Sequence, residues 1–361
     1  MFVALHELRA AWGRFMLMGV VIALVSALVG MVSGFTIGLG NDTVSALRAM
    51  PTDSMVFAKG TSDFTRSVLT GDQVSAWARH SGVNAHPLGI GIFHGETSDD
   101  SSVDMAVIGA EPHSPLLPAT THGRQVAAPG EVVVSEGLAD SGIRIGDSIR
   151  IDNSDVGLHV VGITDTLSYG HVAAAYVPLD TWRLLRFAPD GNLRPHDEGA
   201  AGAIALTGGS APAELADTHV VGEDVILAAA PGYSGERLTM NSIIAFLYVI
   251  APLIVAAFFA VWVVQRRSVY ALQRALGVSR LALVGAALAQ AAVVVVLATV
   301  IGSAIAYLLG LAMGSAVPFD LPATSLATTG IAVIAASMIG SAISLRWVLT
   351  ADPQIMLGES R

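Results

Sequence analysis

Long stretches without a single charged residue constrain this chain more than any other feature of its sequence. No Asp, Glu, Lys or Arg occurs from Phe15 to Asn41, from Leu238 to Gln265, or from Leu281 to Phe319. Each stretch exceeds the roughly 20 apolar residues that cross the hydrocarbon layer of a membrane as a helix. Because 53% of the residues are hydrophobic and only 13% are charged, the composition indicates a membrane protein with polar parts, not an ordinary soluble domain.

The charge-free stretches divide the chain into alternating apolar and polar segments. The third stretch is too long for one straight span, so we expect a turn near Pro318 to Pro322 and a further helix from Leu321 to Leu345. Pro252, near the middle of the second stretch, predicts a kink. The predicted organisation is a cytoplasmic amphipathic helix (1–14), transmembrane helix 1 (15–41), an extracytoplasmic domain (42–236), transmembrane helix 2 (237–265), a cytoplasmic turn (266–280), transmembrane helices 3 and 4 (281–345) and a cytoplasmic tail (346–361).

The N-terminal region leaves two alternatives open. Apolar residues at helical spacing beside two arginines are typical of a helix lying on the membrane surface, and a frayed terminus is the alternative. The stretch after it could also be a cleaved signal peptide, but it is longer than such a region and no Ala-x-Ala site follows it. The residues that form the amphipathic pattern are Phe2, Leu5, Leu8, Trp12, Arg9 and Arg14.

Residues 42–236 have a different character. They hold 25 Asp and Glu against 10 Lys and Arg, and short β-like runs alternate with Gly, Pro and Asp turns. The run from Asp190 to Gly202 is a predicted loop, and the polar run from Thr97 to Ser102 is predicted to be a hairpin tip or a second loop. The fold class is therefore an α-helical membrane protein with four transmembrane helices and an α+β extracytoplasmic domain inserted between helices 1 and 2. Strands are predicted at Val132 to Ser135, Ser148 to Ile151, Leu158 to Ile163 and Ala173 to Val177, and helices around Gly71 to His80 and Leu179 to Phe187.

Arginine gives the orientation. The three segments assigned to the cytoplasm hold eight Arg and three acidic residues, and the turn at 266–280 holds four Arg and no acid. Since cytoplasmic segments of membrane proteins are enriched in Lys and Arg, both termini are predicted to be cytoplasmic. The expected location is the plasma membrane of a bacterium, with multiple spans and membrane lipid as a surrounding partner.

Missing residue types exclude several functions. The chain has no cysteine, so disulfides and Cys-ligated metal sites are impossible. Its one lysine, Lys59, is not part of a Walker A sequence, and the motifs of zinc proteases and serine hydrolases are absent as well. We therefore expect no catalytic residues, no permanently bound cofactor and no nucleic-acid partner.

The turn and the layout together resemble a known family. One domain inserted after the first of four helices, the run Gln273 to Arg280 (Gln-Arg-Ala-Leu-Gly-Val-Ser-Arg) and the Ala-Asp-Pro at 351–353 resemble the FtsX-like (MacB-type) permeases of ABC transporters over the whole chain. The resemblance implies that the turn docks on a separate ATPase subunit, present in two copies, which binds the ATP. The residues implied in ATPase coupling are Arg266, Arg267, Arg274, Gly277, Ser279 and Arg280.

Within the family, two stretches look most like haem-exporter permeases of the HrtB kind. They are Thr164 to Tyr169 continuing through Ala173 to Trp182, and Pro231-Gly232-Tyr233 before the second span. The resemblance implies a permease that extrudes haem from the membrane by a lever-like movement. The alternatives are an FtsX-like permease that exports a lipoprotein, peptide or drug, and a non-transporting regulator of a cell-wall hydrolase.

The candidate cargo site lies where helices 1 and 2 meet the extracytoplasmic domain. All ten His fall outside the predicted spans, so a haem in the membrane would need Tyr, Met or carboxylate ligands. Glu236 is the main candidate because a carboxylate can ligate ferric iron, and Arg48 or Arg237 could pair with the haem propionates. The alternative is that Glu236 and Arg237 only mark the helix end. The predicted haem-binding residues are Glu236, Tyr233, Met240, Asn241, Arg48, Arg237 and Tyr169, with no other metal site expected.

A stripe of small residues predicts close helix packing. Ser26, Gly30, Gly34 and Gly38 recur every four residues in the first span and leave one helix face open to close approach. We interpret this face as the interface with a second copy of the chain. A similar row in the third span, Gly302, Ala306, Gly310 and Gly314, is interpreted as packing alone.

Overall fold

The computed structural model describes residues 12–265, 272–273, 276–314 and 317–350. The chain divides into two compact units. A helical unit comprises the residues up to Gly38 and those from Arg237 onward, and a sheet unit comprises Leu39 to Glu236. The predicted amphipathic helix at 1–14 and the tail at 346–361 fall largely outside the described residues.

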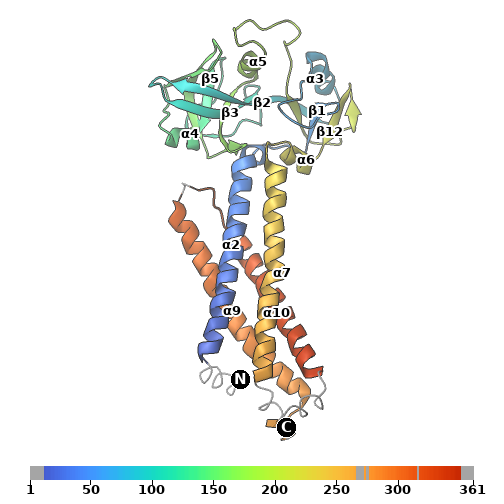
Figure 1. The fold of residues 1–361 in the computed structure, drawn as a ribbon. Helices are drawn as coiled ribbons and strands as arrows, with labels where there is room; N and C mark the ends of the chain where they lie inside the picture. Colours follow the sequence, from blue (N-terminus) through green and yellow to red (C-terminus); the bar gives the residue numbers. More distant parts are fainter. Residues whose placement is uncertain (1–11, 266–271, 274–275, 315–316, 351–361) are drawn as a thin grey trace. The chain divides into compact units, whose positions relative to one another are not determined.

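The described residues of the helical unit form four long apolar helices, as predicted. Each holds a segment long and apolar enough to cross a membrane, and the predicted apolar turn separates the last two. Their bounds differ from the predicted spans, because α2 continues beyond Asn41 and α7 begins before Arg237. Figure 1 shows α2 (Trp12–Arg48), α7 (Tyr233–Gln265), α9 (Arg280–Met313) and α10 (Ala323–Thr350).

One apolar cluster joins all four helices of this unit. Ile22 of α2, Val255 and Trp262 of α7, and Val295 of α9 are almost completely buried in it, and Met338 of α10 packs against them. Pro252 lies inside α7 and does not end the helix. At this proline α10 comes close to the α7 backbone, since a methyl group added at Gly340 would lie 2.5 Å from the carbonyl oxygen of Pro252.

The small-residue stripe of α2 is a helix interface, but its partner belongs to the same chain. A methyl group added at Gly30 would lie 2.8 Å from the Ala306 side chain, and one at Gly302 would lie 2.3 Å from the carbonyl oxygen of Ala23. Ser26 is buried and donates a hydrogen bond to the Thr299 carbonyl oxygen at 3.2 Å. The same face meets the predicted turn, where Gly34 and Gly38 would clash with Phe319 and Pro318 if they carried a side chain.

This packing corrects the assignment of that face to a second copy. Because α9 and the turn before α10 already fill it, Ser26, Gly30, Gly34 and Gly38 hold one chain together. The row in α9 is close packing, as interpreted, at Gly302, Ala306 and Gly310, whereas Gly314 has nothing within 4 Å of an added methyl group.

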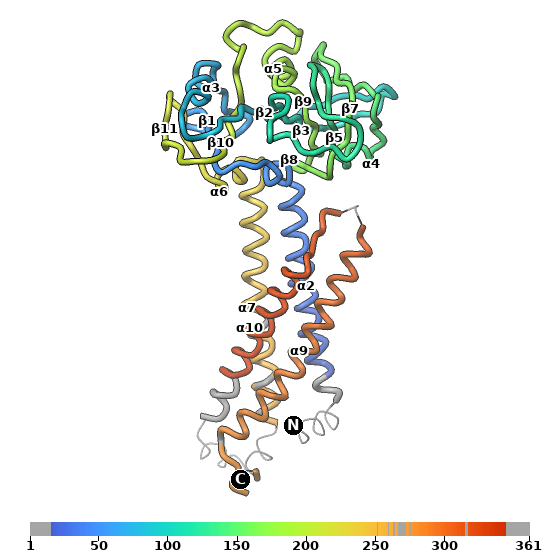
Figure 2. Tube along the Cα trace, turned by 180° about the vertical axis from the view of Figure 1, so that it is seen from behind, coloured from blue at the N-terminus to red at the C-terminus, as the bar shows by residue number. Residues whose placement is uncertain are grey.

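The sheet unit is built on a mixed sheet whose strands pair in the order β11-β12-β1-β10-β2-β3-β9-β5-β7-β4, with β6 pairing β2 and β7, and β8 pairing β9. The β3–β9 and β5–β7 pairs are parallel and the others antiparallel. Figure 2 shows the trace from the opposite side. The strands are β1 (Ser54–Ala58), β2 (Asn84–Thr97), β3 (Ser102–Ala110), β4 (Thr120–Gly123), β5 (Glu131–Ser135), β6 (Ser148–Ile151), β7 (Gly157–Thr164), β8 (Ser168–Tyr169), β9 (Val172–Pro178), β10 (Ala203–Thr207), β11 (Glu214–Leu215) and β12 (Thr218–Val221).

Short helices cover this sheet. Trp182 of α5 is 1% exposed and lies flat on the paired glycines Gly89 and Gly109, which leave room for its ring. The opposite side carries a core to which the last turns of α2 and the start of α7 contribute, through Leu47 and Tyr233 among others. The short helices are α3 (Gly71–Ala78), α4 (Glu136–Asp140), α5 (Leu179–Phe187) and α6 (Glu223–Ala228).

Candidate functional site at the adjoining ends of α2 and α7

An ion-pair cluster lies within the sheet unit, where the last turns of α2 meet the first turn of α7. It consists of Asp42 from α2, Glu236 from α7 and His171 from the turn between β8 and β9. The imidazole stands between the two carboxylates, with Nδ1 2.8 Å from Asp42 Oδ2 and Nε2 2.9 Å from Glu236 Oε1. All three side chains are about one-third exposed.

The turn that carries His171 is as tight as a hairpin turn can be. Tyr169 pairs with Val172, so Gly170 and His171 alone form the loop, with φ angles of +61° and +63°. Both residues therefore have the left-handed backbone conformation that a type I′ hairpin turn requires. Glycine and asparagine are the usual residues there, and histidine is among the few other residues enriched in this conformation.

Hydrogen bonds fix this hairpin to α2. The Gly170 amide donates to the Thr43 carbonyl oxygen at 2.8 Å, and the Ser168 amide donates to Ser45 Oγ at 2.8 Å. Ser45 in turn donates to the Ser168 carbonyl oxygen at 3.3 Å. The position of His171 is thus set by backbone contacts with α2.

Glu236 is held at Oε1, which contacts His171 Nε2 at 2.9 Å. Thr43 Oγ1 lies 3.3 Å from Oε2, but the Thr43 hydroxyl donates its hydrogen to the Leu39 carbonyl oxygen at 2.7 Å. The residue before the helix makes room for this carboxylate, because a methyl group added at Gly232 would lie 2.8 Å from Oε1, and Gly232 is itself left-handed with φ +81°. Position 232 of the Pro-Gly-Tyr stretch therefore needs glycine, both for its backbone conformation and for the space that the Glu236 carboxylate occupies.

Arg48 lies beside this cluster. It donates to Asn41 Oδ1 at 2.5 Å and to the Tyr233 hydroxyl at 3.3 Å, which joins the end of α2 to the start of α7 a second time. Arg48 is exposed, whereas Tyr233 is 5% exposed.

The electrostatics of the cluster favour a charged imidazole. Partial burial lowers the pKa of His171, but the hydrogen bonds and charges of Glu236 and Asp42 outweigh it and raise the pKa above the ordinary value.

The cluster could supply a ligand to iron in a porphyrin. Among the described residues, no group of three His, Asp or Glu is arranged to hold a free metal ion. A porphyrin supplies four of the iron ligands itself, so one carboxylate or imidazole is enough to complete a site.

Of the predicted haem-binding residues, Arg48 and Tyr233 share a hydrogen bond, and Glu236 follows Tyr233 in the first turn of α7. Arg237, Met240 and Asn241 follow along α7 and belong to the helical unit. Arg237 and Asn241 are exposed there and Met240 is partly buried.

Tyr169 takes a different place. It is 1% exposed, packs edge-on against Phe64 in the core of the sheet unit, and burial raises its pKa well above the usual range. Ligation by a tyrosine requires the phenolate, so this environment suits a core residue and gives iron no access.

The residues predicted to couple to an ATPase are only partly described. Arg266, Arg267 and Arg274 lie outside the described residues. Gly277 is left-handed with φ +90°, and Ser279 is the N-cap of α9, accepting a hydrogen bond from the Ala282 amide at 3.2 Å. The turn therefore ends at Arg280, where α9 begins with a capped N-terminus.

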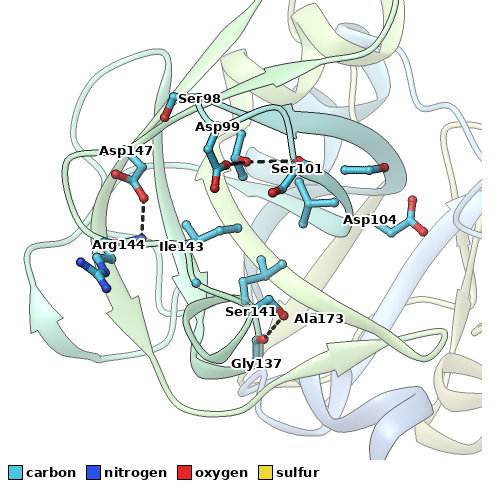
Figure 3. Close-up of a pocket in the computed structure, with 15 residues that line it drawn as sticks. Ser98, Asp99, Ser101, Asp104, Gly137, Ser141, Ile143, Arg144, Asp147 and Ala173 are labelled. Atoms are coloured by element: carbon cyan, nitrogen blue, oxygen red, sulfur yellow. Dashed lines mark hydrogen bonds between the residues drawn. The ribbon is translucent and has the colours of Figure 1, made fainter.

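A separate open pocket of about 540 Å³ lies between the β2–β3 hairpin and α4. Its walls are polar, and Figure 3 shows Asp99, Asp104 and Asp147 around it together with several serines. On the same hairpin Ser102 Oγ lies 2.9 Å from His94 Nε2, and His94 Nδ1 contacts Asp104. These side chains are exposed, and they contact one another between β2 and β3 as cross-strand neighbours in a sheet do.

His171 is the member of the cluster that the sequence did not reveal. His171 falls between the two halves of the stretch that carried the family resemblance, two residues after Tyr169. A Gly-His pair between two short β-like runs was the available signal, because it fits a two-residue hairpin turn.

Comparisons with known proteins agree with this layout. Residues 241–353 match the family model described as the FtsX-like permease C-terminal. The chain is 22% identical over 320 residues to a protein named as the hemin transport system permease HrtB of Staphylococcus haemolyticus, covering 88% of this chain and 87% of the relative. A protein of the same name from Staphylococcus epidermidis is 20% identical over 283 residues, covering 76% of each chain.

Solved structures resemble part of the chain. The periplasmic region of MacB from Actinobacillus actinomycetemcomitans matches with a TM-score of 0.36 and 15% identity, covering 50% of this chain and 93% of that one. The extracellular domain of the ABC-type transporter YknZ from Gram-positive bacteria matches with a TM-score of 0.33 and 13% identity, covering 44% and 84%.

Proposed function

We propose that the chain is an FtsX-like permease of the ABC transporter type and the membrane subunit of an exporter that extrudes haem. The observation that carries the proposal is the collinear match to permeases named for hemin transport. That match runs through both units and covers 87% of the first relative, so it includes the sheet unit as well as the membrane helices.

The ion-pair cluster gives this cargo a chemical basis. Glu236 offers a carboxylate that is about one-third exposed. Arg48, which donates to Tyr233 in the same first turn of α7, has a guanidinium that can pair with a propionate. Carboxylate oxygen is a suitable ligand for ferric iron, and a single oxygen ligand favours a cargo that is later released.

Energy for export comes from a partner in this proposal. An ABC permease works with an ATPase subunit, which would dock on the arginine-rich turn at 266–280. Two copies of the ATPase and two copies of this chain would form the complex in a bacterial plasma membrane, with both termini cytoplasmic. ATP-driven closure would move the helices as levers and expel haem that enters from the lipid.

Hemin titration of the purified full chain tests the cargo. We expect a Soret shift on binding to the wild type and its loss in Glu236→Ala. Glu223→Ala is the matched control, since Glu223 also lies in the first turn of a helix and is exposed. A wild type that does not bind hemin would contradict the proposed cargo, and an unchanged Soret band in Glu236→Ala would remove Glu236 as the ligand.

Growth provides the matching test in cells. A strain that lacks this permease should be more sensitive to hemin than its parent, and the gene should restore tolerance. Equal sensitivity of the two strains would favour a lipoprotein, peptide or drug as cargo, or a regulatory role without transport.

A further inference from the structure

An exposed apolar surface lies next to the ion-pair cluster in the sheet unit. Ile92 of β2 is 45% exposed, and Pro231, in the segment before α7, is exposed as well. A methyl group added at Gly170 would lie 3.5 Å from Ile92 Cδ1 and 3.6 Å from Pro231 Cδ. Two apolar side chains from distant parts of the sequence therefore border the same glycine of the β8–β9 turn.

This apolar surface is contiguous with the Glu236 carboxylate. Gly170 directly precedes His171, whose Nε2 lies 2.9 Å from Glu236 Oε1. Likewise, Pro231 directly precedes Gly232, and a methyl group added at Gly232 would lie 2.8 Å from the same oxygen. The proposed iron ligand is thus in contact with the immediate chain neighbours of two residues that form the apolar surface.

Position 170 leaves the apolar surface uncovered. Gly170 is left-handed, with φ +61°, but asparagine is also common in this conformation in type I′ turns. Nor does a clash exclude a side chain, because a β-carbon at this position would stand at ordinary contact distance from Ile92 and Pro231. A side chain longer than a methyl group would extend into the space beside these two residues.

We propose that Ile92 and Pro231 form an apolar contact surface for the porphyrin ring of the cargo, beside the carboxylate that ligates its iron. Sites for small ligands are mostly apolar, with a few polar groups that fix orientation. Haem is an apolar plane with a cationic centre and two propionates. The sheet unit offers apolar carbon atoms for the plane, the Glu236 carboxylate for the iron and the Arg48 guanidinium for a propionate.

This inference rests on the proposed function, because it takes haem as the cargo and Glu236 as its ligand. It adds that the chain recognises the ring itself. The substrate class is therefore the porphyrins, and a porphyrin without iron should bind as well, with lower affinity than hemin because it lacks the bond to Glu236.

Titration of the full-length chain with hemin and with iron-free protoporphyrin tests this surface. Ile92→Ser should weaken the binding of both by about tenfold, because the apolar contact is lost whether or not the ring holds iron. Ile145→Ser is the matched control, since Ile145 is also 45% exposed. It should change neither affinity.

Gly170→Asn tests the same surface by covering it. Asparagine accepts the left-handed backbone, and its polar side chain would lie beside Ile92 and Pro231. We expect about tenfold weaker binding of both porphyrins. Gly191→Asn is the control, because Gly191 is left-handed as well, with φ +78°, and has nothing within 4 Å of an added methyl group.

The pair of porphyrins separates this inference from the proposed function. Glu236→Ala should affect hemin alone, whereas Ile92→Ser should weaken both ligands and keep the wild-type Soret band of bound hemin. Wild-type affinity for either porphyrin in Ile92→Ser or in Gly170→Asn would overturn the inference, as would a wild type that binds hemin but no iron-free protoporphyrin. These results leave a hemin-binding wild type, whereas a wild type that does not bind hemin fails the proposed function itself.

Discussion

Glu131 illustrates how one carboxylate can tie a strand to the loop before it. It accepts hydrogen bonds from Arg124 at 2.8 and 2.6 Å, and from the amides of Ala127 and Ala128 at 2.8 and 3.1 Å. Its side chain is 16% exposed. The Arg124 guanidinium foremost, helped by the two amides against the effect of burial, lowers the pKa of Glu131 to about 2.

This pKa predicts a pH-dependent stability. The unfolded carboxyl group has its ordinary, higher pKa, so the stabilisation is complete above that value and is lost as the pH falls towards about 2. Glu131→Gln should therefore lower the free energy of unfolding by roughly 1 to 2 kcal/mol at pH 7, and by much less near pH 3. Thermal unfolding of the full chain at both pH values measures this.

The control for Glu131 is an exposed pair. Glu214 lies 3.5 Å from Lys59 with both side chains about 60% exposed, so Glu214→Gln should change stability little at either pH. Equal effects of the two substitutions at pH 7 would contradict the role given to Glu131.

The contact between α2 and α9 depends on glycine. A methyl group at Gly302 would meet the α2 backbone at 2.3 Å, where no flexible side chain can move away. Gly302→Ala should therefore separate the helices and lower the free energy of unfolding by about 1 to 3 kcal/mol, measured as a lower unfolding temperature in detergent.

A second glycine in α9 is the control for this substitution. Gly285 has nothing within 4 Å of an added methyl group, so Gly285→Ala should leave stability unchanged or slightly higher. A destabilised Gly285→Ala, or a Gly302→Ala chain as stable as the wild type, would show that close approach at Gly302 is not what holds these helices together.

Local patterns predicted elements better than they predicted contacts. The helix Leu179–Phe187 has the predicted bounds, and β5, β6, β7 and β9 lie where their apolar runs were found, because each pattern is contained in a few residues. The pairing of β1 with β10 and β12 joins segments about 150 residues apart, which periodicity does not encode. The small-residue stripe likewise predicted close packing but could not say which helix would fill it.

The candidate site was also predicted in its individual residues but not in the contacts between them. The apolar run and the acid at its start indicated Glu236 as a boundary residue. His171 is 65 residues away, and it reaches Glu236 only because the β8–β9 hairpin is bonded to the last turns of α2. That arrangement depends on the tertiary fold, so the pairing could not be read from the spacing of the residues.

In the chain as a whole, energy input and cargo binding are expected at different segments. The start of α9 is fixed by the Ser279 N-cap, directly after the arginine-rich turn. Arg280→Glu should therefore reduce ATP-driven export at least about tenfold while hemin affinity stays unchanged. Arg194→Glu, an exposed charge in a loop of the sheet unit, is the control and should alter neither quantity. Loss of hemin binding in Arg280→Glu would show that this turn does more than couple.

The central claim is that hemin bound at Glu236 is the cargo of an ATP-driven exporter. Its most direct test is the ATPase activity of this chain reconstituted with its ATPase subunit in lipid, measured with and without hemin. The account predicts that hemin stimulates the wild-type complex and leaves the Glu236→Ala complex at its basal rate. A wild-type complex whose ATPase activity does not respond to hemin, or an equal response of both complexes, would contradict it.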